Sequence, residues 1–141
     1  MASILIIDDD PDAADLVGRV MRRAGHQVSV APNGREAIAH LSGALPDLVI
    51  LDMRMPEMDG VSFLEVLRSY LRWQHVPVIL VTAYPEGPDI EHAAELGAAD
   101  VFRKGDLGFD ELLTAVDQKL AARAGDGGGP AQWVPPPPAH A

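Results

Sequence analysis

Five short runs of apolar residues alternate with segments in which apolar residues recur at helical spacing. The runs cover residues 4–7, 28–31, 48–51, 78–81 and 101–102. The run at 28–31 is weaker because it contains Ser29, but the runs at 4–7, 48–51 and 78–81 are apolar at consecutive positions, which is typical of parallel strands that helices cover on both faces. The pattern therefore predicts five strands, each followed by a helix.

The segments between the runs carry helix signals of their own. Asp10 and Asn33 stand where two helices would begin and are typical N-cap residues, while Gly25 and Gly97 stand where two helices would end. Alternating strands and helices predict the α/β class with right-handed crossovers. We expect a doubly wound (βα)5, flavodoxin-like, three-layer fold with a parallel five-stranded sheet in the order 2-1-3-4-5.

The composition changes near residue 125, which predicts one domain over residues 1–124 and a disordered Gly/Pro-rich tail over 125–141. The tail contains three consecutive glycines and, after Trp133 and Val134, four consecutive prolines. There is no cysteine, no apolar run long enough to span a bilayer and no pattern of a signal peptide. We expect a cytoplasmic protein without membrane contact.

The formal net charge of -10 disfavours binding to nucleic acid, because phosphates repel an acidic surface. Lysine and arginine do not form a run anywhere in the sequence. We therefore expect no direct DNA binding. The acidic balance fits either solubility alone or a cation site, and the placement of the acids decides between them.

Polar side chains follow four of the predicted strands. Asp8 and Asp9 follow the first strand, Asp52 the third, Thr82 ends the fourth, and Lys104 lies at the end of the fifth. In doubly wound sheets, ligands bind at the carboxyl ends of the strands. Carboxylates without His or Cys select a hard ion such as Mg²⁺, and a carboxylate can attack phosphorus as a nucleophile. Lys104 and Thr82 would then contact phosphate oxygens.

With these residues in place, the sequence resembles the receiver domains of response regulators over about residues 3–124. The resemblance rests on Ile-Leu-Ile-Ile-Asp-Asp-Asp-Pro at 4–11, Leu-Asp-Met-Arg-Met-Pro-Glu-Met-Asp-Gly at 51–60, Val-Thr-Ala at 81–83, and Gly-Ala-Ala-Asp at 97–100 followed by Lys104.

The resemblance implies a role for each matching residue. Asp52 matches the phosphoacceptor, Thr82 the hydroxyl that moves toward the phosphate, and Lys104 the phosphate-binding lysine. The metal ligands would be Asp52, Asp9 directly, Asp8 mostly through water, and the carbonyl of Arg54. The function implied is a phosphoacceptor switch in a two-component His-to-Asp phosphorelay.

The resemblance also implies partners. A histidine kinase or a histidine phosphotransfer protein would donate the phosphoryl group, and the domain itself would catalyse the transfer and a slow hydrolysis, without an independent enzyme activity. The output would pass by protein contact through the face at about residues 89–124.

The sequence departs from the family pattern at two positions. Gly105 follows Lys104, where the family usually has a proline after a cis bond. Because a cis bond without proline costs about 2.5–4 kcal/mol, we expect this bond to be trans. Val101 stands where an aromatic switch residue is usual, and strand alternation would place Phe102 on the opposite face. Tyr84 is expected near the entrance of the site.

Three other functions each match part of the sequence. A receiver-like scaffold that binds partners without phosphorylation draws support from Val101 and Gly105. A phosphatase of the haloacid-dehalogenase type matches the Asp8-x-Asp10 spacing but not the Pro11 that follows. A flavodoxin-like FMN site would need a phosphate loop after the first strand, where three aspartates would repel the phosphate instead.

Overall fold

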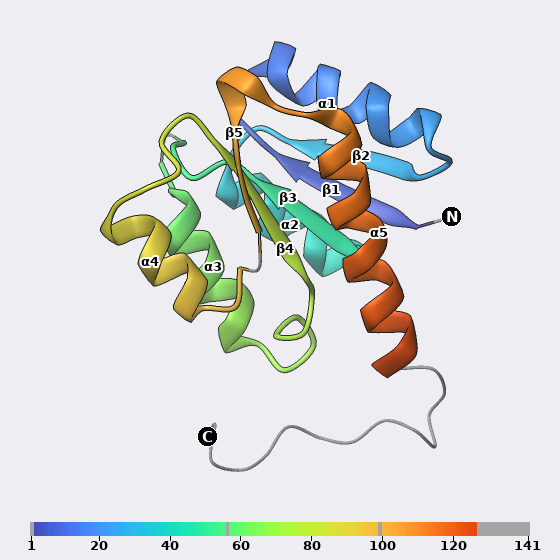
Figure 1. The fold of residues 1–141 in the computed structure, drawn as a ribbon. Helices are drawn as coiled ribbons and strands as arrows, with labels where there is room; N and C mark the ends of the chain where they lie inside the picture. The colour runs from blue at the N-terminus through green and yellow to red at the C-terminus, as the bar shows by residue number, and fades with distance from the viewer. Residues whose placement is uncertain (1, 56, 99, 127–141) are drawn as a thin grey trace.

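The computed structural model describes residues 2–55, 57–98 and 100–126, and these form one three-layer α/β unit (Figure 1). Its five parallel strands have the order β2-β1-β3-β4-β5, as the sequence predicted. The strands are β1 (Ser3–Ile7), β2 (Gln27–Ala31), β3 (Leu48–Leu51), β4 (Val78–Thr82) and β5 (Asp100–Arg103). The helices are α1 (Pro11–Arg23), α2 (Gly34–Gly43), α3 (Gly60–Ser69), α4 (Pro88–Glu95) and α5 (Phe109–Asp126).

Two apolar layers hold the sheet between the helices. Side chains of α1 and α5 pack on one face of the strands, and those of α2, α3 and α4 pack on the other. Every residue of β3 and β4 is buried, which agrees with the continuous apolar runs that predicted them. The edge strands β2 and β5 are only partly buried, and this explains why their sequence patterns are weaker.

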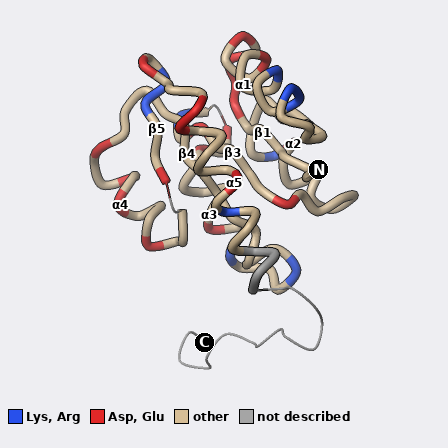
Figure 2. Tube along the Cα trace, turned by 45° about the vertical axis from the view of Figure 1, so that its right-hand side comes forward, with Lys and Arg blue, Asp and Glu red and all other residues tan. Residues whose placement is uncertain are grey.

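The helix N-termini confirm the predicted caps. The Asp10 carboxylate accepts the main-chain N–H of Asp12, and the Asn33 side chain accepts that of Glu36. The helix α4 is different: Gly87 precedes it and provides no side-chain cap, and Ala93 is its only buried residue. Its charged residues are acidic apart from His92, so Figure 2 shows red and no blue along it. The α4 helix is therefore short, acidic and weakly anchored.

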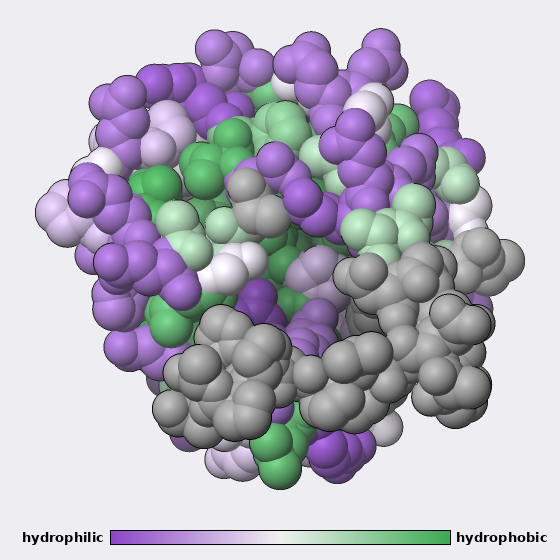
Figure 3. Space-filling model, turned by 60° about the horizontal axis from the view of Figure 1, so that its bottom comes forward, coloured by the Kyte–Doolittle hydropathy of each residue, from purple (hydrophilic) through white to green (hydrophobic). Residues whose placement is uncertain are grey.

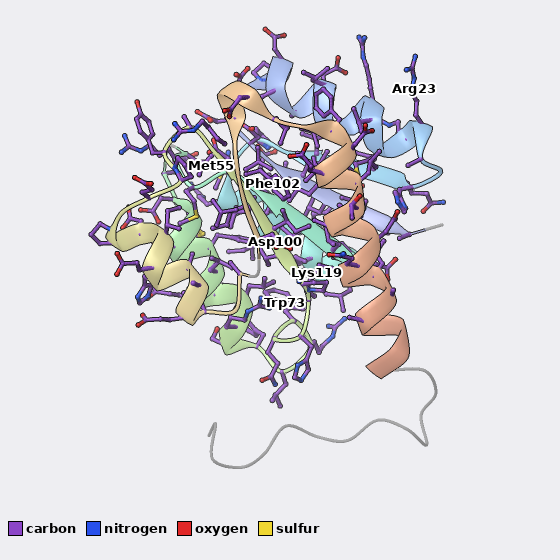
Figure 4. All side chains as sticks on the ribbon, in the orientation of Figure 1. Arg23, Met55, Trp73, Asp100, Phe102 and Lys119 are labelled. Atoms are coloured by element: carbon purple, nitrogen blue, oxygen red, sulfur yellow. The ribbon has the colours of Figure 1, made fainter. Side chains whose placement is uncertain are left out.

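The chain turns sharply after β5. Lys104 begins a short 3-10 turn, η1 (Lys104–Asp106), which the sequence did not predict. The described residues contain no cis peptide bond, so the bond between Lys104 and Gly105 is trans, as expected. Val101 pairs with Leu80 and is 37% exposed, whereas Phe102 packs with the α1 and α5 layer (Figure 4). The predicted alternation is confirmed.

The helix α5 continues to Asp126, two residues beyond the predicted domain boundary. The remainder of the predicted tail, residues 127–141, lies outside the described residues. In the part of the chain that is described, no helix is long and apolar enough to cross a membrane.

Candidate functional site: an acidic cluster beside Lys104

The site forms where the strand order reverses, between β1 and β3. Ile7 and Leu51 are register partners, so the residues that follow them, Asp8 and Asp52, meet at one edge of the sheet. The main-chain N–H of Asp52 donates to the carbonyl of Ile7 at 2.9 Å, and this bond ties the two strand ends together. Carboxylate oxygens of Asp8, Asp9 and Asp52 all lie within 4.8 Å of one another.

Lys104 lies between the two buried carboxylates. Its Nζ is 2.9 Å from Oδ2 of Asp8, 3.0 Å from Oδ1 of Asp8 and 3.2 Å from Oδ2 of Asp52. The side chains of Asp8 and Asp52 are almost fully buried, while Asp9 is exposed. The structure therefore brings together Asp8, Asp9, Asp52 and Lys104, which the sequence placed at three separate strand ends.

Burial and charge both disfavour ionisation of Asp52. Desolvation, followed by the nearby charge of Asp8, raises the pKa of Asp52 from 3.8 to about 6, and Lys104 offsets only part of this rise. For Lys104, burial disfavours the ammonium, but the hydrogen bond to Asp8 and the charges of Asp52 and Asp8 outweigh it, so its pKa is raised. At neutral pH Asp52 is therefore mostly ionised and faces the Lys104 ammonium.

This electrostatic cost predicts that Asp52→Asn stabilises the fold at pH 7. The folded protein holds the Asp52 proton more tightly than the unfolded chain does, so stability is lost as pH rises between about 4 and 6. A shift of roughly two units corresponds to about 2–3 kcal/mol, which the asparagine avoids. Urea unfolding should show this gain at pH 7 and its disappearance near pH 4. Asp117→Asn, at an exposed position of α5, is the control, and an equal gain at both pH values contradicts the prediction.

Thr82 ends β4 with its side chain buried, and its Oγ1 accepts the main-chain N–H of Tyr84 at 3.2 Å. The guanidinium of Arg54 lies 4.1 Å from the centre of the Tyr84 ring, a cation–π contact. The sequence singled out the Arg54 carbonyl but not its side chain, because nothing in the sequence pairs it with Tyr84. The Arg54 N–H donates to Oδ1 of Asp52 at 3.3 Å, and the role of its carbonyl as a metal ligand stays a prediction.

Gly60 allows the N-terminus of α3 to approach the loop after β3. Its N–H donates to the Met53 carbonyl at 3.0 Å, and a Cβ at this position would lie 2.8 Å from the Cα of Met53. It would also lie 3.2 Å from the Asp52 carbonyl oxygen. The sequence alone does not predict this close approach, because it depends on how α3 packs against the loop after β3.

We therefore expect Gly60→Ala to lower the free energy of unfolding by about 1–3 kcal/mol, because backbone atoms have to move to admit the methyl group. Thermal or urea unfolding measures this effect. Gly43→Ala is the matched control, since a Cβ there meets nothing within 4 Å and alanine favours a helix. Equal unfolding midpoints of the two variants contradict the prediction.

A cavity of about 290 Å³ opens beside the acidic cluster, between α1 and the connection from β5 to α5. Leu16, Val17, Leu107 and Phe109 form its apolar wall, and Asp8, Asp52 and Lys104 line it as well. Leu16 is 50% exposed. The sequence did not predict this cavity. The one signal available was Leu16, an apolar residue on the solvent side of α1.

Comparison with known proteins identifies the class. The family model of the response regulator receiver domain matches residues 4–117. The chain therefore belongs to the response regulator receiver domain family, in agreement with the fold and with the resemblance noted from the sequence.

Similarity to individual proteins supports the same family. Over 121 residues the chain is 36% identical to sporulation initiation phosphotransferase F of Bacillus subtilis, covering 86% of this chain and 95% of that protein. It is 31% identical to the gliding motility regulatory protein of Myxococcus xanthus, but spans only 15% of that longer protein. The crystal structure of the signal receiver domain of a signal transduction histidine kinase from Syntrophus aciditrophicus has a TM-score of 0.79 and 34% identity, covering 86% of this chain and 92% of that one.

Proposed function

We propose that this protein is a phosphoacceptor switch in a two-component phosphorelay and that Asp52 takes the phosphoryl group. The observation that carries the proposal is the position of Asp52, which is buried and lies 3.2 Å from the Lys104 ammonium. An ionised Asp52 oxygen forms a bond to phosphorus while the bond from phosphorus to the donor histidine nitrogen breaks. The electron pair of that bond stays on the imidazole. Lys104 stabilises the charge on the phosphoryl oxygens.

The acidic cluster fits a hard divalent cation. Three carboxylates whose oxygens lie within 4.8 Å of one another repel strongly, and an all-oxygen set suits Mg²⁺. Asp8, Asp9 and Asp52, with the carbonyl of Arg54, would hold the ion. When bound, Mg²⁺ supplies charge neutralisation for the transferred phosphoryl group. The buried Thr82 hydroxyl, at the end of β4, would bond the phosphoryl oxygens after transfer.

The experiment that tests the function is direct labelling. The protein is incubated with Mg²⁺ and a small phosphodonor, and an acid-stable, base-labile phosphoryl group is sought and located by mass spectrometry. We expect one such group, on the peptide that contains Asp52, and no labelling after chelation of the metal. Absence of labelling under all conditions favours the alternative, a receiver-like scaffold whose binding does not depend on phosphorylation.

The cavity beside Asp52 supports a protein donor, either a histidine kinase or a histidine phosphotransfer protein. A donor that brings its histidine to Asp52 has to pass α1 and the β5–α5 connection, where Leu16 offers apolar contact. The output partner would bind the surface formed by α4, β5 and α5, where Val101 is exposed. In this proposal the switch is cytoplasmic and acts through protein contacts and not through DNA.

We therefore expect Leu16→Ser to slow phosphoryl transfer from a phosphorylated histidine phosphotransfer protein about tenfold, because burial of a leucine contributes roughly 1.5 kcal/mol or more to docking. Phosphorylation by a small donor should be unchanged, since it needs no docking surface. Leu45→Ser, another partly exposed leucine, is the control and should leave both rates unchanged. If Leu16→Ser slows phosphoryl transfer from both donors, the substitution acts on the phosphorylation site itself and not on docking.

A further inference from the structure

A second concave surface lies at the end of the molecule opposite Asp52. It is a groove of about 600 Å³ between α2 and the connection from α3 to β4, and Ile38, Tyr70, Leu71 and Trp73 provide its apolar part. Leu71 is 85% exposed and Tyr70 is 54% exposed. Figure 3, which brings this end of the molecule forward, shows apolar surface between polar side chains. The proposed phosphoacceptor function makes no use of this groove.

The groove has aromatic walls. The rings of Tyr70 and Trp73 lie 4.5 Å apart at an angle of 48°. Trp73 is buried, and its indole N–H has no acceptor among the described residues. The hydroxyl of Ser69 already donates to the carbonyl of Val66 within α3. The surface that the groove presents is therefore the exposed Tyr70 ring, packed on Trp73, beside the exposed Leu71 side chain.

The C-terminal sequence carries a segment with the complementary chemistry. Residues 133–138 read Trp-Val-Pro-Pro-Pro-Pro. Proline has a main-chain acceptor but no donor, and consecutive prolines favour the polyproline II helix, which aromatic-lined grooves bind. Residues 127–141 contain no Asp, Glu, Lys or Arg, so this acidic protein does not repel them.

Six residues, 127–132, connect the end of α5 to this segment. Each helix runs back from the carboxyl edge of the sheet, so Asp126 at the end of α5 lies at the same end of the molecule as the α3–β4 connection (Figure 1). Trp73 also lies toward this end of the sheet (Figure 4). Residues 127–132 can span about 20 Å when extended, at roughly 3.3–3.6 Å per residue. Glycines at 127–129 allow the chain to change direction.

The geometry points to an intramolecular contact: residues 133–138 bind in the groove of Ile38, Tyr70, Leu71 and Trp73, with proline rings against the aromatic rings. This contact covers the exposed side chain of Leu71 and places main-chain carbonyls next to the Tyr70–Trp73 pair. It leaves the Asp52 edge open, because the groove lies at the other end of the strands.

Nuclear magnetic resonance of the full chain tests the contact. The chain has two tryptophans, so it gives two indole N–H signals, which Trp133→Phe assigns. The tail variant replaces Pro135, Pro136, Pro137 and Pro138 by glycine and leaves the domain unchanged, and the groove variant is Leu71→Asp. We expect both variants to shift the signals of residues 70–73. In the unaltered protein the indole nitrogen of Trp133 should relax like the nitrogens of the folded domain. In both variants it should relax like that of a rapidly moving segment. Leu45→Asp, a partly exposed leucine outside the groove, should do neither.

Addition of a peptide with the sequence of residues 131–141 to the tail variant should restore the signals of residues 70–73. Unchanged signals in the tail variant, together with fast relaxation of Trp133 in the unaltered protein, overturn the proposal. Shifts that appear only as the protein concentration rises would assign the groove to the tail of a second copy and also overturn the intramolecular contact.

Discussion

Asp52→Asn is expected to abolish phosphorylation by both small and protein donors, because an amide oxygen is not a nucleophile toward phosphorus. The variant keeps the shape of the side chain, and the Asp52 N–H still donates to Ile7. Loss of labelling therefore reports chemistry and not unfolding. The readout is the amount of base-labile phosphate per protein, measured with the same donor and metal concentration for each variant.

The matched control for Asp52→Asn is Asp10→Asn. Asp10 is also an aspartate at this edge of the sheet, but its carboxylate caps α1, and asparagine caps a helix about as well. We expect Asp10→Asn to label like the unaltered protein. Labelling of Asp52→Asn at the normal level would remove Asp52 from the reaction. Equal partner binding by labelled and unlabelled protein would favour the scaffold alternative.

Lys104→Met has the second large expected effect, a loss of about 100-fold or more in the rate of phosphoryl uptake. Lys104 is the cation that contacts both Asp8 and Asp52, and removal of one such group from a transition state typically costs this much. The variant should also raise the pKa of Asp52 further, because Lys104 lowers it. The pH at which uptake is half-maximal should therefore move upward.

Lys119→Met is the control for Lys104→Met. Lys119 pairs with Asp100 at 3.4 Å across α5 and β5 (Figure 4), away from the acidic cluster. The rate of phosphoryl uptake by Lys119→Met and the pH profile of that rate should match those of the unaltered protein. A Lys104→Met protein with a normal rate would mean that Lys104 only balances charge in the resting state.

The features that could be predicted from the sequence are those with a local signal. Continuous apolar runs mark β3 and β4 because both faces of these strands are buried, and polar residues at the strand ends mark the site because the topology brings those ends together. The trans bond at Lys104 followed from the cost of the alternative.

The remaining features depend on contacts between distant segments. The short turn at Lys104–Asp106, the approach of Gly60 to Met53 and the stacking of Arg54 on Tyr84 each join segments whose sequences give no sign of the contact. The cavity beside Leu16 depends on how α1 and the β5–α5 connection pack, which amphipathic spacing does not determine. Apolar patterning predicts which face of a helix is covered, but not what remains uncovered.

Because α4 is weakly anchored, we expect it to respond to a change at Asp52. Local unfolding costs least where few apolar side chains are buried, and α4 buries only Ala93 and begins without a side-chain cap. Tyr84, whose main-chain N–H donates to Oγ1 of Thr82, lies only a few residues before the start of α4. Amide hydrogens of α4 should therefore exchange with solvent sooner than those of α1, and a small displacement near Thr82 should rearrange α4 at a lower free-energy cost than α1.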